Sequence, residues 1–130
     1  MEIIKLDDTM YHEEIIIVIN ATEKQFSAYY KQKIGWEPPP PFKQGYFITA
    51  VNGDKEIHFI YLQKFTWRIC DYGLLAHEIL HCVCSVFESI GIGMHNKSEE
   101  AWTYYMQHLY TDAVGKIKDK LEKTNANSKK

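Results

Sequence analysis

Hydrophobic residues along the chain follow two spacings, one typical of strands and one typical of helices. A β-branched run at residues 14–20 predicts a buried strand. Residues 46–51 and 56–62 also have strand-like composition, and the Asn-Gly-Asp-Lys segment between them predicts a hairpin turn. Helical spacing predicts three helices, at residues 22–34, 72–90 and 97–123.

Polar residues and glycines mark the ends of the first two predicted helices. Side chains of Asn, Thr and Asp can accept hydrogen bonds from free N–H groups at a helix start, and glycine adopts the left-handed conformation that ends a helix. The expected caps and stops are Asn20 or Thr22 with Gly35 for the first helix, and Asp71 with Gly91 or Gly93 for the second.

The order strand, helix, hairpin, helix, helix predicts an α+β fold with a small mixed sheet. The prolines at residues 38–41 predict a stiff connector between the first helix and the hairpin. With 130 residues in total, we expect one domain over residues 1–123 and a flexible basic tail over residues 124–130.

Composition is ordinary for a globular protein, with 45% hydrophobic and 25% charged residues. The net charge of −2 predicts no general attraction to nucleic acid or to a membrane. Acidic and basic residues interrupt the first twenty positions, so no secretory signal is expected, and we expect no membrane-spanning run. Three cysteines do not resemble a disulfide framework, which favours a reducing, cytoplasmic location.

Three polar residues interrupt the most hydrophobic helix of the chain. Residues 74–87 are otherwise apolar nearly all the way round, so we expect this helix to be buried. Burying His77, Glu78 and His81 without partners would cost several kcal/mol. The pattern therefore predicts a compensating partner, for which a divalent metal ion is the simplest choice.

The three residues form an HExxH sequence. His77 and His81 are four residues apart, so their side chains lie one turn apart on the same helix face, within reach of one zinc ion. Glu78 lies about 100° around the helix, where it can act on a water molecule rather than bind the metal. The alternative is that the two histidines form hydrogen bonds only with protein groups.

A third metal ligand is expected in the next helix. Eighteen residues separate His81 from Glu100, which lets an antiparallel helix direct that carboxylate at the histidines. Glu99 is the rival, but its spacing from Asn96 is that of a capping box. Three other residues are weaker candidates: His95, His108 and Asp112.

The sequence His77-Glu78-x-x-His81 followed by Glu100 resembles the gluzincin metallopeptidases, which bind catalytic zinc through two histidines and a glutamate. Residues 99–105 are also similar to small zincin-like proteins encoded by phages and prophages, and more faintly to metallopeptidases that cleave repressors. The resemblance covers roughly residues 45–112. Cys84 and Phe87 replace the glycine and histidine of a metzincin, so that branch is excluded.

The resemblance implies a minimal zincin-like domain with one Zn²⁺ per chain and a peptide or protein substrate. Zinc lowers the pKa of a bound water, and Glu78 would then act as general base in peptide hydrolysis. Tyr104 and His108 follow Glu100 on one helix face and are candidate oxyanion donors, although both could equally be packing residues. The aspartate expected near position 104 in thermolysin-like relatives is absent.

Three further expectations concern the substrate and the alternatives. The strand at residues 46–51 is expected to be a sheet edge that holds an extended peptide. His58, on its partner strand, is expected to be an ordinary strand residue, and the alternating cysteines Cys82 and Cys84 to be buried packing residues. The competing functions are a non-catalytic zincin-like binding module and a helical-core protein without metal.

Overall fold

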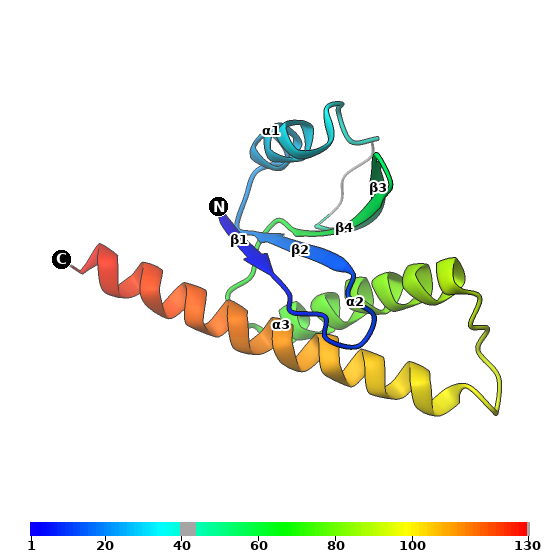
Figure 1. Ribbon diagram of the computed structural model, residues 1–130. Helices are drawn as coiled ribbons and strands as arrows, with labels where there is room; N and C mark the ends of the chain where they lie inside the picture. The colour runs from blue at the N-terminus through cyan, green and yellow to red at the C-terminus, as the bar shows by residue number, and fades with distance from the viewer. Residues whose placement is uncertain (40–43, 130) are drawn as a thin grey trace.

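The computed structural model describes residues 1–39 and 44–129 and arranges them in layers around one sheet (Figure 1). Helix α1 (Glu23–Ile34) covers one face, while α2 (Ile69–Ile90) and α3 (Glu99–Ser128) cover the other. The four strands are β1 (Glu2–Lys5), β2 (Glu14–Ile19), β3 (Gly45–Asn52) and β4 (Lys55–Leu62), in the spatial order β1-β2-β4-β3. Because β2 and β4 pair in parallel and the outer pairs are antiparallel, the sheet is mixed, and the predicted α+β class is confirmed.

Alternation of side chains along the strands sorts the hydrophobic core into two halves. Ile16 and Val18 of β2 belong to the half under α1, whereas Ile15, Ile17 and Ile19 belong to the half under α2 and α3. Both faces of the central strands are thus buried, which explains the continuous apolar run at residues 14–20. The β3–β4 hairpin lies at one side of the sheet with β3 as the edge strand, as the sequence predicted.

Several predicted helix ends are confirmed. Thr22 is the N-cap of α1, where its Oγ1 accepts a hydrogen bond from the Gln25 backbone N–H at 3.1 Å. Gly35 and Gly91 end α1 and α2 with φ angles of 103° and 78°, values that favour glycine.

Other boundaries differ from the prediction. Helix α2 begins at Ile69 with Arg68 at its N-cap, so Asp71 lies inside the first turn instead of capping it. Ser98 is the N-cap of α3 without a side-chain capping bond, so the capping box expected from Asn96 and Glu99 is wrong. The sequence analysis also missed β1, a four-residue strand between charged ends. The prolines at positions 40 and 41 of the expected connector lie outside the described residues.

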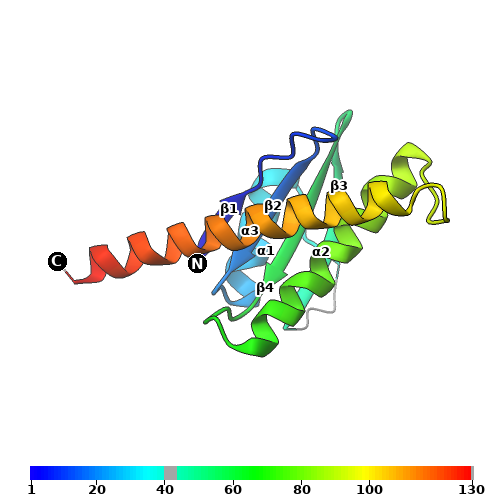
Figure 2. The same ribbon diagram turned by 90° about the horizontal axis from the view of Figure 1, so that it is seen from below.

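The two long helices pack against each other and against the sheet (Figures 1 and 2). Ile117 is the last buried residue in the described part of α3, and the helix continues to Ser128, so residues 124–128 of the expected tail are helical. Helix α2 is long and apolar enough to cross a membrane, with a mean hydropathy of 1.3. In this structure its apolar side instead forms the core with α3 and the sheet.

Candidate metal centre

The HExxH residues lie along a contact line between α2 and the edge strand β3. On β3 the alternate residues Gly45, Phe47 and Thr49 face α2. Gly45 lies against Glu78, and the Phe47 ring is parallel to that of His81, with centroids 6.3 Å apart. Successive residues on this face of β3 thus contact successive turns of α2. The spacings nearly match, because two strand residues advance about 6.6 Å and one helical turn advances about 5.4 Å.

The two histidines of the motif are close together. Their Nε2 atoms lie 3.1 Å apart, and the ring planes are at 77° to each other. Two imidazole nitrogens that bind one tetrahedral zinc ion at about 2.05 Å lie about 3.3 Å from each other. The 3.1 Å contact is a hydrogen bond between the two rings, and the same spacing is close to that needed to share one ion, for which the chemistry of the pair suits zinc.

Glu78 is the buried member of the motif, with 5% of its surface exposed. Burial raises the pKa of its carboxyl above the ordinary value, and the neighbouring His77 and His81 oppose that shift. A Cβ atom at Gly45 would lie 2.8 Å from Glu78 Oε1, so the absence of a side chain at position 45 makes room for the carboxylate. Sequence reasoning missed Gly45, because its role depends on how β3 sits against α2.

Helix α2 is less buried than its sequence predicted. His77 and His81 are exposed, as are Leu80 and Cys84. The sheet and α3 cover only part of the helix surface, and the remaining apolar residues face solvent. The desolvation argument for a metal therefore applies to Glu78 and not to the two imidazoles, and the prediction that Cys84 is buried is wrong.

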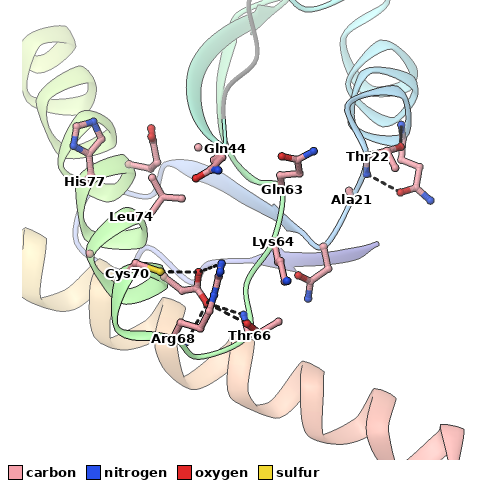
Figure 3. Close-up of a pocket in the computed structure, with 16 residues that line it drawn as sticks. Ala21, Thr22, Gln44, Gln63, Lys64, Thr66, Arg68, Cys70, Leu74 and His77 are labelled. Atoms are coloured by element: carbon pink, nitrogen blue, oxygen red, sulfur yellow. Dashed lines mark hydrogen bonds and ion pairs between the residues drawn. The ribbon is translucent and has the colours of Figure 1, made fainter.

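A cavity of ≈ 1250 Å³ opens beside His77 and Glu78. Figure 3 shows His77 and Leu74 on the α2 side and Thr22 at the start of α1 on the other, with Gln44 and Gln63 between them. The same cavity contacts the polar start of α2. It is large enough to hold one or more side chains of a bound peptide.

A charged pair supports the rim of this cavity. Arg68 donates to both carboxylate oxygens of Asp71, at 2.8 and 3.2 Å, and the Thr66 backbone N–H donates to the same group at 2.9 Å. These bonds, first among them that from Arg68, lower the pKa of Asp71 to about 2. Asp71, predicted as a helix cap, thus fixes the loop that leads into α2.

Glu100 does not join the histidines in this structure. Trp102 packs on Phe87, with ring centroids 4.8 Å apart, which fixes the register of α3 against α2. Because α3 runs back along α2, Glu100, two residues before Trp102, lies level with a position about two residues after Phe87. That position is about eight residues beyond His81, or roughly 12 Å along the axis of α2. Its exposed side chain is not grouped with His77 and His81 among the metal-ligating clusters of the described residues.

The other residues proposed for the site also lie elsewhere. Tyr104 is 60% exposed, and neither it nor His108 lines the cavity beside Glu78. His108 is placed with Nε2 3.2 Å from the backbone oxygen of Asp7. Of the weaker ligand candidates, His95 accepts a bond from the Lys97 backbone N–H, and Asp112 pairs with Lys116.

The structure forms one further cluster that the sequence analysis did not predict. Ligand atoms of Glu13, Glu56 and His58 all lie within 4.8 Å of one another. His58, expected to be an ordinary strand residue, is completely buried. The alternating Glu56 and His58 on one strand were the available signal, but Glu13 is brought to them only by the parallel pairing of β2 with β4.

Comparisons of the chain with protein-family models, with curated proteins and with solved structures find no match.

Proposed function

We propose that the chain is a zinc-dependent metallopeptidase that uses His77 and His81 as metal ligands and Glu78 as general base. The observation that carries the proposal is the placement of two imidazole nitrogens 3.1 Å apart next to a buried carboxylate at an open cavity. HExxH helices bind zinc in this manner, with the glutamate left free for proton transfer.

Each protein group has a separate task in the proposed reaction. Zinc, when bound, supplies a Lewis acid that acidifies water and polarises a carbonyl. Glu78 accepts a proton from the water that attacks the carbonyl carbon, and then donates it to the nitrogen of the leaving amine. Its pKa, raised by burial, is closer to neutrality than that of an ordinary carboxylate, which suits a group that must both accept and donate a proton near pH 7.

The edge strand β3 indicates where a peptide substrate would bind and along which line it would run. β3 pairs only with β4, so in the described chain its outer backbone groups face no neighbouring strand. An extended peptide can pair with such an edge, as in β-augmentation. Gly45 and Phe47 lie on the part of β3 next to Glu78 and His81, so a peptide paired there would pass the proposed base. The partners this implies are peptides or proteins. The cytoplasmic location and the lack of nucleic-acid or membrane partners are proposals that rest on the cysteine content and the net charge.

The remote position of Glu100 favours a second candidate function. Catalytic zinc sites usually have three protein ligands, and this structure shows two side chains in place. A non-catalytic zincin-like binding module would need no third ligand. To act as the third ligand of the enzyme, Glu100 would need α3 to shift by roughly 12 Å along α2 against the Trp102–Phe87 contact. The enzyme proposal keeps Glu100 as its third ligand, and zinc affinity tests that role.

A matched pair of variants tests Glu100. Glu100→Gln should weaken zinc binding at least about tenfold if its carboxylate binds the ion, because even groups that only support ligands contribute that much. Glu99→Gln, one position earlier and also exposed, should leave the affinity unchanged. Isothermal titration of chelator-treated protein with Zn²⁺ measures both. Equal affinities would remove Glu100 from the site and favour the binding module.

The activity itself is tested with a peptide library and three variants. The wild type should cleave library peptides, and His81→Ala should lose one zinc per chain and all cleavage, whereas His95→Ala, another exposed histidine, should keep both. Glu78→Gln should keep the zinc and lose cleavage. Cleavage that persists in Glu78→Gln would exclude the proposed base. A wild type that binds zinc at the histidines and cleaves nothing would favour the binding module.

A further inference from the structure

A second group of metal-ligating side chains lies at the end of the sheet opposite the cavity. Glu56 and His58 are two residues apart on β4 and therefore point to the same face of the sheet. The parallel register pairs Glu14 with Ile57, which places Glu13 beside Glu56. Figure 2 shows the loop before β2 next to the β3–β4 turn, and residues 12–14 and 54–56 line one cavity there.

His58 is held in one orientation by groups on both sides of its ring. Its Nδ1 lies 2.8 Å from Thr49 Oγ1, and the same hydroxyl lies 2.8 Å from Ser85 Oγ. Its Nε2 lies 3.2 Å from Glu13 Oε2. When Nδ1 carries the ring proton and donates it to Thr49, the Nε2 lone pair points at the cluster. Histidines that bind metal commonly have their second nitrogen fixed by a hydrogen bond in this manner.

Glu13 is also held in place from outside the cluster. The buried carboxylate of Asp8 accepts a hydrogen bond from the Glu13 backbone N–H at 3.1 Å. The Tyr105 hydroxyl donates to the same Asp8 oxygen at 2.7 Å and ties this loop to α3. The loop that carries Glu13 is thus fixed independently of the Glu13 side chain, so the position is set before any ion binds.

The charges at this end favour a bound cation. A single ring proton can bridge His58 Nε2 to one carboxylate, but the cluster contains two, Glu13 and Glu56, within 4.8 Å of each other. Glu14 and Asp54 line the adjoining cavity of ≈ 480 Å³, with Lys55 as the one lysine or arginine among its lining residues in the described chain. A dication would satisfy the imidazole and both carboxylates together, whereas a proton would leave two like charges close to each other.

We propose that Glu13, Glu56 and His58 form a second metal site, which binds a divalent first-row transition ion and ties the loop before β2 to β4. One imidazole and two carboxylates are ligands that zinc and manganese accept. The site is distinct from the His77–His81 pair and does not depend on peptidase activity. Its ion links segments far apart in the sequence, so it should stabilise the fold and need not take part in hydrolysis.

Zinc binding by a set of variants tests the proposal. In chelator-treated His77→Ala/His81→Ala protein, equilibrium dialysis against Zn²⁺ should still load one ion per chain and raise the unfolding temperature. Adding Glu56→Gln should weaken this binding at least about tenfold. Glu56 is chosen because it is half-buried and glutamine keeps its shape, whereas replacing the buried His58 could prevent folding. Glu14→Gln, a neighbouring acid outside the cluster, is the matched control and should keep the affinity.

The outcomes separate this site from the proposed function. A double histidine variant that folds but binds no zinc would overturn the second site and leave the peptidase proposal intact. Equal weakening by Glu14→Gln and Glu56→Gln would also overturn it, because it would indicate diffuse attraction to acidic residues. One retained ion that Glu56→Gln releases would support the site even if no peptide is ever cleaved by the wild type.

Discussion

The two ends of the contact between α2 and β3 contain similar residue types in opposite environments. At one end, His77 and His81 are exposed and border a cavity of ≈ 1250 Å³. At the other end, His58 is completely buried, with a hydrogen-bond partner at each ring nitrogen. Phe47 lies between the ends, its ring within 13° of parallel to both His58 and His81.

The difference indicates different tasks for the two ends. Open metal positions bind substrate and water, whereas enclosed and fully bonded ones fix structure. The open end combines two exposed histidines with a carboxylate, Glu78, whose burial raises its pKa. At the closed end the Ser85–Thr49–His58–Glu13 chain of contacts fixes the buried imidazole, and Glu56 completes the cluster beside it. This contrast is the reason for proposing chemistry at the open end and a stabilising ion at the closed end.

The largest expected effect separates the two ends by activity. Glu78→Gln should lower kcat/KM for a cleaved peptide by about 10²–10⁴, the usual contribution of a general base. Glu13→Gln, which changes a carboxylate in the same way at the closed end, should change it less than about threefold after correction for folded protein. Both are measured on zinc-loaded protein at pH 7. A comparable loss in Glu13→Gln would show that the two ends are not functionally separate.

The next effect concerns the support of the open end. Asp71→Asn should lower the free energy of unfolding by about 2 kcal/mol, because it weakens the charged hydrogen bonds from Arg68 at a buried site. The pKa of Asp71 is lowered to about 2, so its stabilisation is present above the ordinary carboxyl range and is lost as pH falls from about 4 through 2. Urea unfolding between pH 7 and about 2 measures both the loss at neutral pH and its disappearance in acid.

Exposed Asp119 on α3 supplies the control for Asp71. Asp119→Asn should change stability by less than about 0.5 kcal/mol at pH 7. If Asp71→Asn changed the free energy of unfolding as little as Asp119→Asn, the loop before α2 would not depend on this carboxylate.

A smaller effect is expected from a single methyl group at the open end. In Gly45→Ala the new Cβ would lie 2.6 Å from Leu74 Cδ1 and 2.8 Å from Glu78 Oε1. Both atoms end flexible side chains, so they can move and the fold should persist. The displaced carboxylate should reduce kcat/KM by about tenfold to thirtyfold, since misplacement of a catalytic group by about 1 Å can cost up to a hundredfold.

Gly115→Ala is a matched control for Gly45. Its Cβ would meet nothing within 4 Å on α3, so activity should be unchanged, and helix stability should rise by up to about 1 kcal/mol. Full activity in Gly45→Ala would show that Glu78 need not occupy its position beside β3.

The open end was the more predictable of the two, because most of it is local. The approach of His77 to His81 follows from helix geometry and the spacing of four, which a sequence displays directly. Gly45 and Phe47 could not be predicted as neighbours of this pair, because their positions depend on the register of β3 against α2. Glu100 was predicted from its distance along the chain, but residues 91–98 determine how α3 returns, and they place it too far along α2.

The closed end could not be predicted in the same way. Glu13 and His58 are 45 positions apart and meet only because β2 and β4 pair in parallel. The class of each strand was evident from its β-branched residues, but parallel pairing and register are set by the packing of both faces of the sheet. The role of Asp71 was also missed, although its partners are close in sequence. Its residue type suited a helix cap, but Arg68 and the preceding loop bind its carboxylate instead.

The smallest predicted effect concerns the cost of keeping Glu78 buried. Because burial raises the pKa of Glu78, the folded protein holds the carboxyl proton more tightly than the unfolded chain does. The contribution of Glu78 to the free energy of unfolding is therefore largest at low pH and is lost as pH rises through the folded pKa. In metal-free protein, the stability of Glu78→Gln relative to the wild type should therefore increase from acidic pH to pH 7–8. Urea unfolding of chelator-treated protein measures the difference, with Glu88→Gln, an exposed position on the same helix, as the pH-independent control. A stability difference that does not grow with pH would mean that burial of the Glu78 charge costs nothing, and the contrast between the two ends would then fail.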